Sequence, residues 1–116
     1  SINVKNLIEI LQKKPKIGEK DIQRTILDWL ASQKIFHYRQ NSGAFKDKKN
    51  HLYRFGTSGA PDIVCVIDGR YVGIEVKAKT GIQGESQIAF QAKLEKGGGK
   101  YILAHSLEEL IEKLYN

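Results

Sequence analysis

The sequence predicts a single α/β domain in which helices flank a central mixed β-sheet. Apolar residues recur at helical spacing near both ends of the chain and between residues 19 and 32. Two β-branched runs joined by Asp68-Gly69 predict an antiparallel hairpin, because this dipeptide favours a two-residue turn. A helix and a further strand after that hairpin predict a right-handed parallel crossover. The expected element order is ααβββαβα.

The N-terminal third is expected to supply two helices and one strand. The first helix is expected over residues 2–14 and ends at Pro15, which cannot continue it. The second is expected at 19–32, and residues 35–39 are expected to form a strand. The apolar stripe of the second helix consists of Ile22, Ile26, Trp29 and Leu30.

Residues 41–58 are expected to form a long polar loop, with the option of a short strand at 52–55. Cationic and aromatic side chains alternate here, and such a mixture is typical of surfaces that contact phosphates and stack on bases. A solvated loop over a small aromatic cluster explains the same residues equally well. The candidates for nucleic-acid contact are Lys46, Lys48, Lys49, Tyr53 and Arg54.

The remaining residues are expected to contain the hairpin and two further helices. The elements are strands at 62–67 and 70–77, a helix at 86–96, a strand at 101–104 and a final helix. Ser86 is expected to cap the helix at 86–96. Ser106 and Glu109 have the spacing of a capping box and are expected to open the final helix. The side chains expected to pack inward are Ile88, Phe90 or Gln91, Leu94, Leu107, Leu110, Ile111 and Leu114.

The predicted hairpin brings two carboxylates together. With Asp68-Gly69 as the turn, counting back along both strands places Asp62 opposite Glu75. Directly opposed side chains have Cβ atoms roughly 4.5–5.5 Å apart. Two carboxylates this close repel each other unless they share a cation or a proton. Lys77 points to the same face because strands have period two, so we expect a divalent-metal site with an ammonium group beside it.

Two neighbouring residues are interpreted as shaping this site. Pro61 is expected where the strand begins, because it lacks a backbone donor, and it would present Asp62 at the rim of the sheet. Gly73 shares the face of Glu75 and is expected to leave open space for a ligand. The alternative is that Asp62, Glu75 and Lys77 form a solvated strand face with an incidental salt bridge.

Glu19 and Gln23 are expected on or beside the inward stripe of the second helix, since positions 19, 22, 23, 26 and 30 share one side. Inward carboxylates are rare without a partner. Glu19 is therefore expected to be aimed at the metal cluster. The alternative is an acid at a helix start, where the macrodipole favours negative charge.

Composition fits one globular domain with a polyanionic partner. The chain has 116 residues, of which 41% are hydrophobic and 28% charged, as is usual for a folded domain. Lys and Arg number 19 against 13 Asp and Glu, and the net charge of +6 is compatible with nucleic acid, although many basic proteins bind none. No apolar run approaches the roughly 20 residues that span a bilayer. The single cysteine, Cys65, lies in an apolar run, so we expect it to be buried in a chain suited to the reducing cytoplasm.

The ordered motif Gly59-x-Pro61-Asp62 followed by Glu75-x-Lys77 resembles the PD-(D/E)xK nuclease superfamily. The resemblance extends to its VRR-NUC branch and covers about residues 19–110. The further residues that match this branch are Glu19, Gln23, Asn41-Ser42-Gly43, Gly81, Ser86-Gln87 and Phe90. Archaeal-type Holliday-junction resolvases share the acid, the Pro-Asp and the Glu-x-Lys elements.

The resemblance implies a restriction-endonuclease-like fold for a single domain over 1–116, with an N-terminal helix at 1–15 and a nuclease core at 19–110. It implies Mg²⁺ or Mn²⁺ as the cofactor. The implied ligands are Asp62, Glu75, the backbone carbonyl of Val76 and, directly or through water, Glu19. Lys77 would orient the attacking water or stabilise charge on the scissile phosphate, and Gln87 and Gln23 would support the site.

The implied function is a divalent-metal-dependent endonuclease acting on structured or branched DNA, such as four-way Holliday junctions. Two cuts in opposing strands need two sites, so we expect a homodimer, with no membrane and no small-molecule cofactor, in the cytoplasm of a bacterial or phage-infected cell. The alternatives are a nicking or flap-type nuclease and a non-catalytic nucleic-acid-binding module. An RNA substrate also stays open, because phosphate contacts do not report the sugar.

Overall fold

The computed structural model describes residues 3–12 and 17–116. The elements are α1 (Val4–Gln12), α2 (Glu19–Ser32), β1 (His37–Arg39), β2 (Gly43–Lys46), β3 (Leu52–Phe55), β4 (Ile63–Ile67), β5 (Arg70–Val76), α3 (Glu85–Lys96), β6 (Lys100–Ala104) and α4 (Leu107–Leu114). The expected order is confirmed, with β2 and β3 inserted after β1. The ends of the helix expected at 2–14, and Pro15, lie outside the described residues.

The central sheet has the strand order β1-β4-β5-β6. β4 and β5 are antiparallel, and the pairing of Ile67 with Arg70 and of Ile63 with Ile74 is the register counted from the sequence. Asp68 and Gly69 have φ angles of 53° and 74°, and a type I′ turn requires positive φ at both positions. β6 lies parallel to β5, so the predicted mixed sheet is confirmed.

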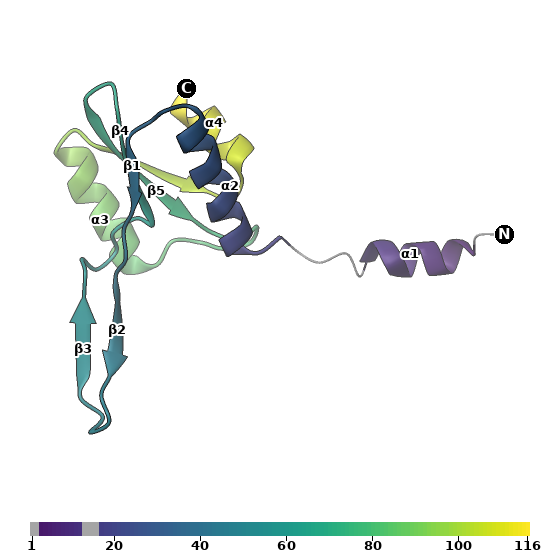
Figure 1. Cartoon of the computed structure of the whole chain (residues 1–116), viewed down its shortest axis with the longest axis horizontal. Helices are drawn as coiled ribbons and strands as arrows, with labels where there is room; N and C mark the ends of the chain where they lie inside the picture. The colour runs from purple at the N-terminus through teal and green to yellow at the C-terminus, as the bar shows by residue number, and fades with distance from the viewer. Residues whose placement is uncertain (1–2, 13–16) are drawn as a thin grey trace.

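Helices cover the two faces of the sheet unequally. α2 and α4 lie on one side of the sheet and α3 lies on the other (Figure 1). Burial of each large aliphatic side chain contributes about 1.5–3 kcal/mol, so the α2 and α4 side carries most of the packing energy. The core on that side consists of Ile22, Ile26, Leu30, Ile63, Cys65, Val72, Ile74, Val76, Ile102, Ala104 and Leu110.

α3 buries none of its own side chains fully, and it contacts the other face through a few residues. The ring of Phe90 lies 6.2 Å from the ring of Tyr101, between centroids. The expectation that Ile88 packs inward is wrong, because 54% of that residue is exposed. A thinly covered face leaves room for polar side chains beneath the helix, and the candidate site lies there.

The two C-terminal helices begin with different caps. The side chain of Ser106 accepts the backbone N–H of Glu109 at 3.0 Å, as predicted for α4. α3 begins one residue earlier than expected, after Gly84, and Ser86 is not its cap. The side chain of Gln87 instead accepts the backbone N–H of Gly84 at 2.8 Å.

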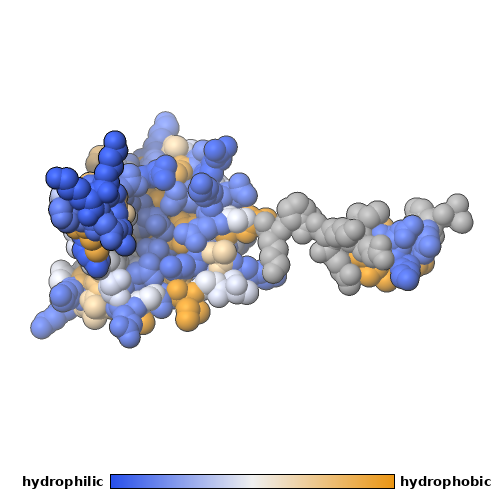
Figure 2. Space-filling view, turned by 90° about the horizontal axis from the view of Figure 1, so that it is seen from below, coloured by the Kyte–Doolittle hydropathy of each residue, from blue (hydrophilic) through white to orange (hydrophobic). Residues whose placement is uncertain are grey.

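The β2–β3 hairpin and α1 lie outside the layered core. β2 and β3 pair only with each other and project from the sheet as a separate hairpin (Figure 1). Residues 41–58 are therefore not a loop with one optional strand. α1 exposes Val4, Leu7 and Ile8, and Figure 2 shows apolar residues along one side of this helix. Among the described residues, no helix combines the length and the apolar character needed to cross a membrane.

Candidate active site

Asp62 and Glu75 lie at the end of the β4–β5 hairpin that is farthest from its turn. Asp62 occupies the bend immediately before β4, and Glu75 is the penultimate residue of β5. The side chain of Asp62 accepts the backbone N–H of Val76 at 2.7 Å. This bond holds the Asp62 carboxylate against the end of β5, beside Glu75.

Glu75 is a buried acid, with only 3% of its surface exposed. Burial raises its pKa to about 8, the neighbouring Asp62 adds to the rise, and Lys77 opposes it. Its Oε2 atom is buried and has no hydrogen-bond partner among the described residues. A buried carboxylate oxygen without a partner is costly, so this atom is available to a proton or a cation.

Lys77 provides a positive charge at a short distance from this pair. Its Nζ lies 3.9 Å from Glu75 Oε1, and 21% of the side chain is exposed. That distance is too long for a hydrogen bond, so the ammonium donors are not committed to Glu75. The group can therefore contact a negatively charged ligand while still acting on the buried acid.

Gln87 links α3 to the buried acid. Its Oε1 accepts the backbone N–H of Gly84, which fixes the amide so that Nε2 donates to Glu75 Oε1 at 2.9 Å. Gly59 has a φ of +79°, and a Cβ there would collide with the backbone oxygen of Ser86. The glycine of the Gly-x-Pro-Asp segment thus lets its backbone approach the start of α3.

The expected open space at Gly73 is not present. A Cβ at Gly73 would lie 2.6 Å from Cγ of Pro61, because the proline ring packs across this glycine. Gly73 therefore serves close packing of Pro61, which is itself buried. The position of Asp62 next to that fixed ring follows from this contact.

Tyr101 is a residue of this face that the sequence patterns did not indicate. It pairs with Gly73 across β5 and β6, and its hydroxyl is buried without a hydrogen-bond partner among the described residues. Burial is the main reason that its pKa is raised, and the charge of Glu75 raises it further. An alternating strand pattern does not indicate that Tyr101 lies near Glu75, because this proximity depends on how β6 pairs with β5.

Glu19 does not have the inward position expected for it. The residue is exposed at the start of α2, while Gln23 is half-buried. The charge of Glu19 nevertheless raises the pKa of Glu75, as the weakest of the causes at that group. Within residues 3–12 and 17–116, no three acidic, histidine or cysteine side chains form a preassembled metal cluster.

The donor set nevertheless suits a hard divalent cation. Mg²⁺ and Mn²⁺ prefer oxygen ligands, and Mg²⁺ is usually bound through only one or two carboxylates together with water and substrate oxygens. Asp62 and Glu75 supply two carboxylates that the fold holds together, one of them with an unpartnered oxygen. A cation beside them would offset the repulsion that raises the pKa of Glu75.

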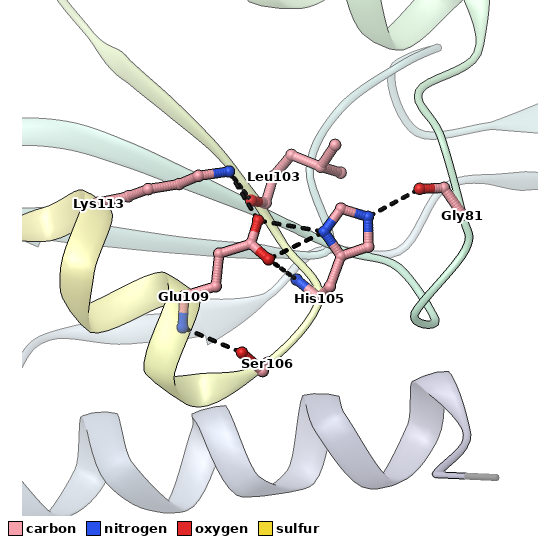
Figure 3. A network of polar contacts seen from close by, with 6 residues as sticks. All are labelled: Gly81, Leu103, His105, Ser106, Glu109 and Lys113. Atoms are coloured by element: carbon pink, nitrogen blue, oxygen red, sulfur yellow. Dashed lines mark hydrogen bonds and ion pairs between the residues drawn. The ribbon is translucent and has the colours of Figure 1, made fainter.

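A polar network that no sequence motif indicated supports the loop that follows Lys77. His105 Nε2 lies 2.8 Å from the backbone oxygen of Gly81, and Nδ1 lies 3.0 Å from a carboxylate oxygen of Glu109 (Figure 3). Both partners accept hydrogen bonds, so this arrangement favours the ring protonated on both nitrogens. The Gly81 carbonyl and then Glu109 raise the pKa of His105. A Cβ at Gly81 would lie 2.9 Å from Cβ of Lys77, so this loop packs directly against the lysine.

The candidate nucleic-acid residues lie elsewhere in the fold. Lys46 ends β2, Lys48 and Lys49 lie in the connection, and Tyr53 and Arg54 belong to β3. All belong to the β2–β3 hairpin, which projects from the central sheet (Figure 1). The site itself brings together Asp62, Glu75, Lys77 and Gln87.

Comparison with known proteins adds no identification: no family model matches the chain, and no curated protein matches it.

Proposed function

We propose that this protein is a divalent-metal-dependent endonuclease of the restriction-endonuclease-like fold that acts on structured DNA. The observation that carries the proposal is the half-buried Asp62 beside the buried Glu75, which has one unpartnered oxygen, with the ammonium of Lys77 next to them. Two carboxylates and a lysine at the end of a hairpin suit phosphodiester hydrolysis, in which negative charge develops on the phosphate. The resemblance to VRR-NUC nucleases rests on the same residues.

The proposed metal ligands are Asp62, Glu75, the Val76 carbonyl and, through water, the exposed Glu19. A bound Mg²⁺ or Mn²⁺ would supply Lewis-acid stabilisation of the phosphate and a water with a lowered pKa. Lys77 would bind a non-bridging phosphate oxygen or orient the water. Gln87 would keep the Glu75 carboxylate in one orientation through its own bond to Gly84.

Cleavage of labelled DNA in the presence of Mg²⁺, Mn²⁺ or EDTA tests the proposal. The substrates are a four-way junction, nicked, flap and linear duplexes, and an RNA of matched sequence. Asp62→Asn and Glu75→Gln should lower cleavage at least about a hundredfold, the scale of losing one electrostatic catalytic element, while DNA binding persists. Glu85→Gln, an exposed acid on α3, is the matched control. Retained activity in both site variants would refute the assignment.

The same substrates separate junction resolution from looser nuclease activity. Paired, symmetric cuts in the junction require two sites and therefore a homodimer, because each chain supplies one. Sedimentation at the working concentration checks the assembly, and a monomer would exclude resolution by paired cuts. Equal cutting of all DNA substrates would keep the nuclease and remove the junction preference. Metal-independent binding without any cleavage would indicate a nucleic-acid-binding module.

A further inference from the structure

The β2–β3 hairpin has two chemically different faces. Phe45 pairs with Tyr53, and Gly43 pairs with Phe55. Since side chains alternate along a strand, these aromatic rings share one face. The opposite face carries the pairs Ala44–Arg54 and Lys46–Leu52.

The aromatic face is uncovered. Phe45 is 57% exposed, Tyr53 47% and Phe55 48%. The rings of Phe45 and Tyr53 stack, with centroids 5.2 Å apart and planes inclined by 19°, and the ring centroid of Phe55 lies 6.5 Å from that of Phe45. A Cβ at Gly43 would lie 3.0 Å from the Phe55 ring, so this glycine makes room for it. The result is an aromatic platform built from residues of the hairpin alone.

Positive charge lies at the tip of the hairpin and on the face opposite the platform. The cations of the hairpin are Lys46, Lys48, Lys49 and Arg54. The hairpin contains one acid, Asp47, which is already bonded to the backbone N–H groups of Lys49 and His51, both at 2.9 Å. These bonds close the turn and hold the two lysines of the connection at the tip.

The charge of the hairpin complements a polyanion and disfavours docking of this hairpin on the same hairpin of a second copy. A partner of the same sequence carries +6 overall, so face-to-face docking of two hairpins would bring like charges together. Nucleic acid offers both chemistries that the hairpin presents, because bases stack on aromatic rings and phosphates bind cations. Bases inside a duplex are already stacked on each other, so the platform can serve only unpaired bases.

We propose that the aromatic face of the β2–β3 hairpin stacks on unpaired bases while Lys48 and Lys49 at its tip hold the adjacent phosphates. The inference rests on the proposed function in one respect: unpaired bases at a branch or flap would bring the scissile phosphate to Asp62 and Glu75. The binding itself needs neither metal nor cleavage.

Fluorescence anisotropy in EDTA tests this surface apart from catalysis. The probes are labelled single-stranded DNA and fully paired duplex of the same sequence. Wild type should bind the single strand more tightly than the duplex. Phe45→Leu and Tyr53→Leu keep an apolar side chain but lose the ring, and each should weaken single-strand binding about tenfold with little effect on duplex. Tyr115→Ala, an aromatic residue 70% exposed near the C-terminus, is the control.

Salt dependence distinguishes the two chemistries of the hairpin. Lys48→Ala and Lys49→Ala should each lower the slope of log K against log salt by about one if the lysine neutralises one phosphate. The leucine variants should leave that slope unchanged. Equal weakening of single strand and duplex by the leucine variants, or no weakening in a variant with wild-type circular dichroism, would overturn the proposal. A dimer in sedimentation that the leucine variants dissociate would also overturn it, because the face would then be a protein interface.

The single-strand preference of the hairpin is tested independently of the nuclease proposal. Loss of cleavage in Asp62→Asn with intact single-strand preference would leave the hairpin inference standing. Full cleavage by a protein that shows no single-strand preference would leave the nuclease and remove the inference.

Discussion

At the level of single residues, Glu75 determines the electrostatics of the site. Its side chain is buried next to another acid, so its pKa is raised far above the usual range, to about 8. The unfolded chain releases this proton near its ordinary pKa of 4.5. Between these two values the folded chain binds more protons than the unfolded chain, so the free energy of unfolding falls as pH rises.

Glu75→Gln should therefore change the pH dependence of stability. In EDTA, the variant should match wild type near pH 5 and be more stable near pH 9, because glutamine has no proton to lose. Each pKa unit of difference corresponds to about 1.4 kcal/mol. Urea unfolding at the two pH values, with Glu85→Gln as the control, measures the effect. Parallel pH curves for wild type and Glu75→Gln would show that Glu75 is not the buried acid that titrates.

His105 gives a second pH dependence of the same sign. Its pKa is raised by the Gly81 carbonyl and by Glu109, so its stabilising contribution is complete below the ordinary value of 6.5 and is lost as pH rises through the raised value. His105→Gln should thus destabilise the protein more at pH 5.5 than at pH 8.5. The exposed histidine of the hairpin, changed as His51→Gln, is the control in the same urea titration. An equal loss at both pH values would mean that the ring acts through packing alone.

At the level of elements, the turn between β4 and β5 sets the register that brings the two acids together. Gly69 has a φ of +74° and no atom within 4 Å of its missing Cβ, so its conformation alone demands glycine. Gly69→Ala should cost about 1–2 kcal/mol, the penalty for a left-handed residue with a side chain. Gly97→Ala is the matched control, since Gly97 has a φ of −81°. Urea denaturation measures the free energy of unfolding of both variants. Equal losses would show that the positive φ at Gly69 is not what the turn requires.

The sequence predicts an element well where a local sequence pattern and burial in the core favour the same structure. The Asp68-Gly69 turn and the apolar runs beside it determined the hairpin register, and the apolar stripe determined the bounds of α2. β2 was missed because it pairs only with β3 and lacks a buried face that would impose alternation on it. The Pro61 contact at Gly73 and the bond from Gln87 to Glu75 depend on how separate elements dock, and no local pattern encodes them.

At the level of the whole molecule, two functional surfaces are built in different ways. The candidate active site lies on the thinly covered face of the sheet, where α3 contributes Gln87 and the β4–β5 hairpin contributes the acids. The projecting β2–β3 hairpin depends on its own turn and aromatic pairs, since it adds no strand to the central sheet. A change in one surface should therefore leave the other folded, which allows binding and catalysis to be tested separately.

Metal binding should oppose the pH dependence of the stability of the whole molecule. Without metal, Glu75 and His105 both make the protein less stable as pH rises, so its melting temperature in EDTA should be lower at pH 8.5 than at pH 6. A cation at the acids competes with the Glu75 proton, so Mn²⁺ should raise the melting temperature more at pH 8.5 than at pH 6. Saturation at about a hundred times the dissociation constant would add about 2.7 kcal/mol. Differential scanning fluorimetry with Mn²⁺, and with Ca²⁺ as a second oxygen-preferring ion, measures these shifts. The shift should be absent in Asp62→Asn, and an equal shift in that variant would place the cation elsewhere on the protein.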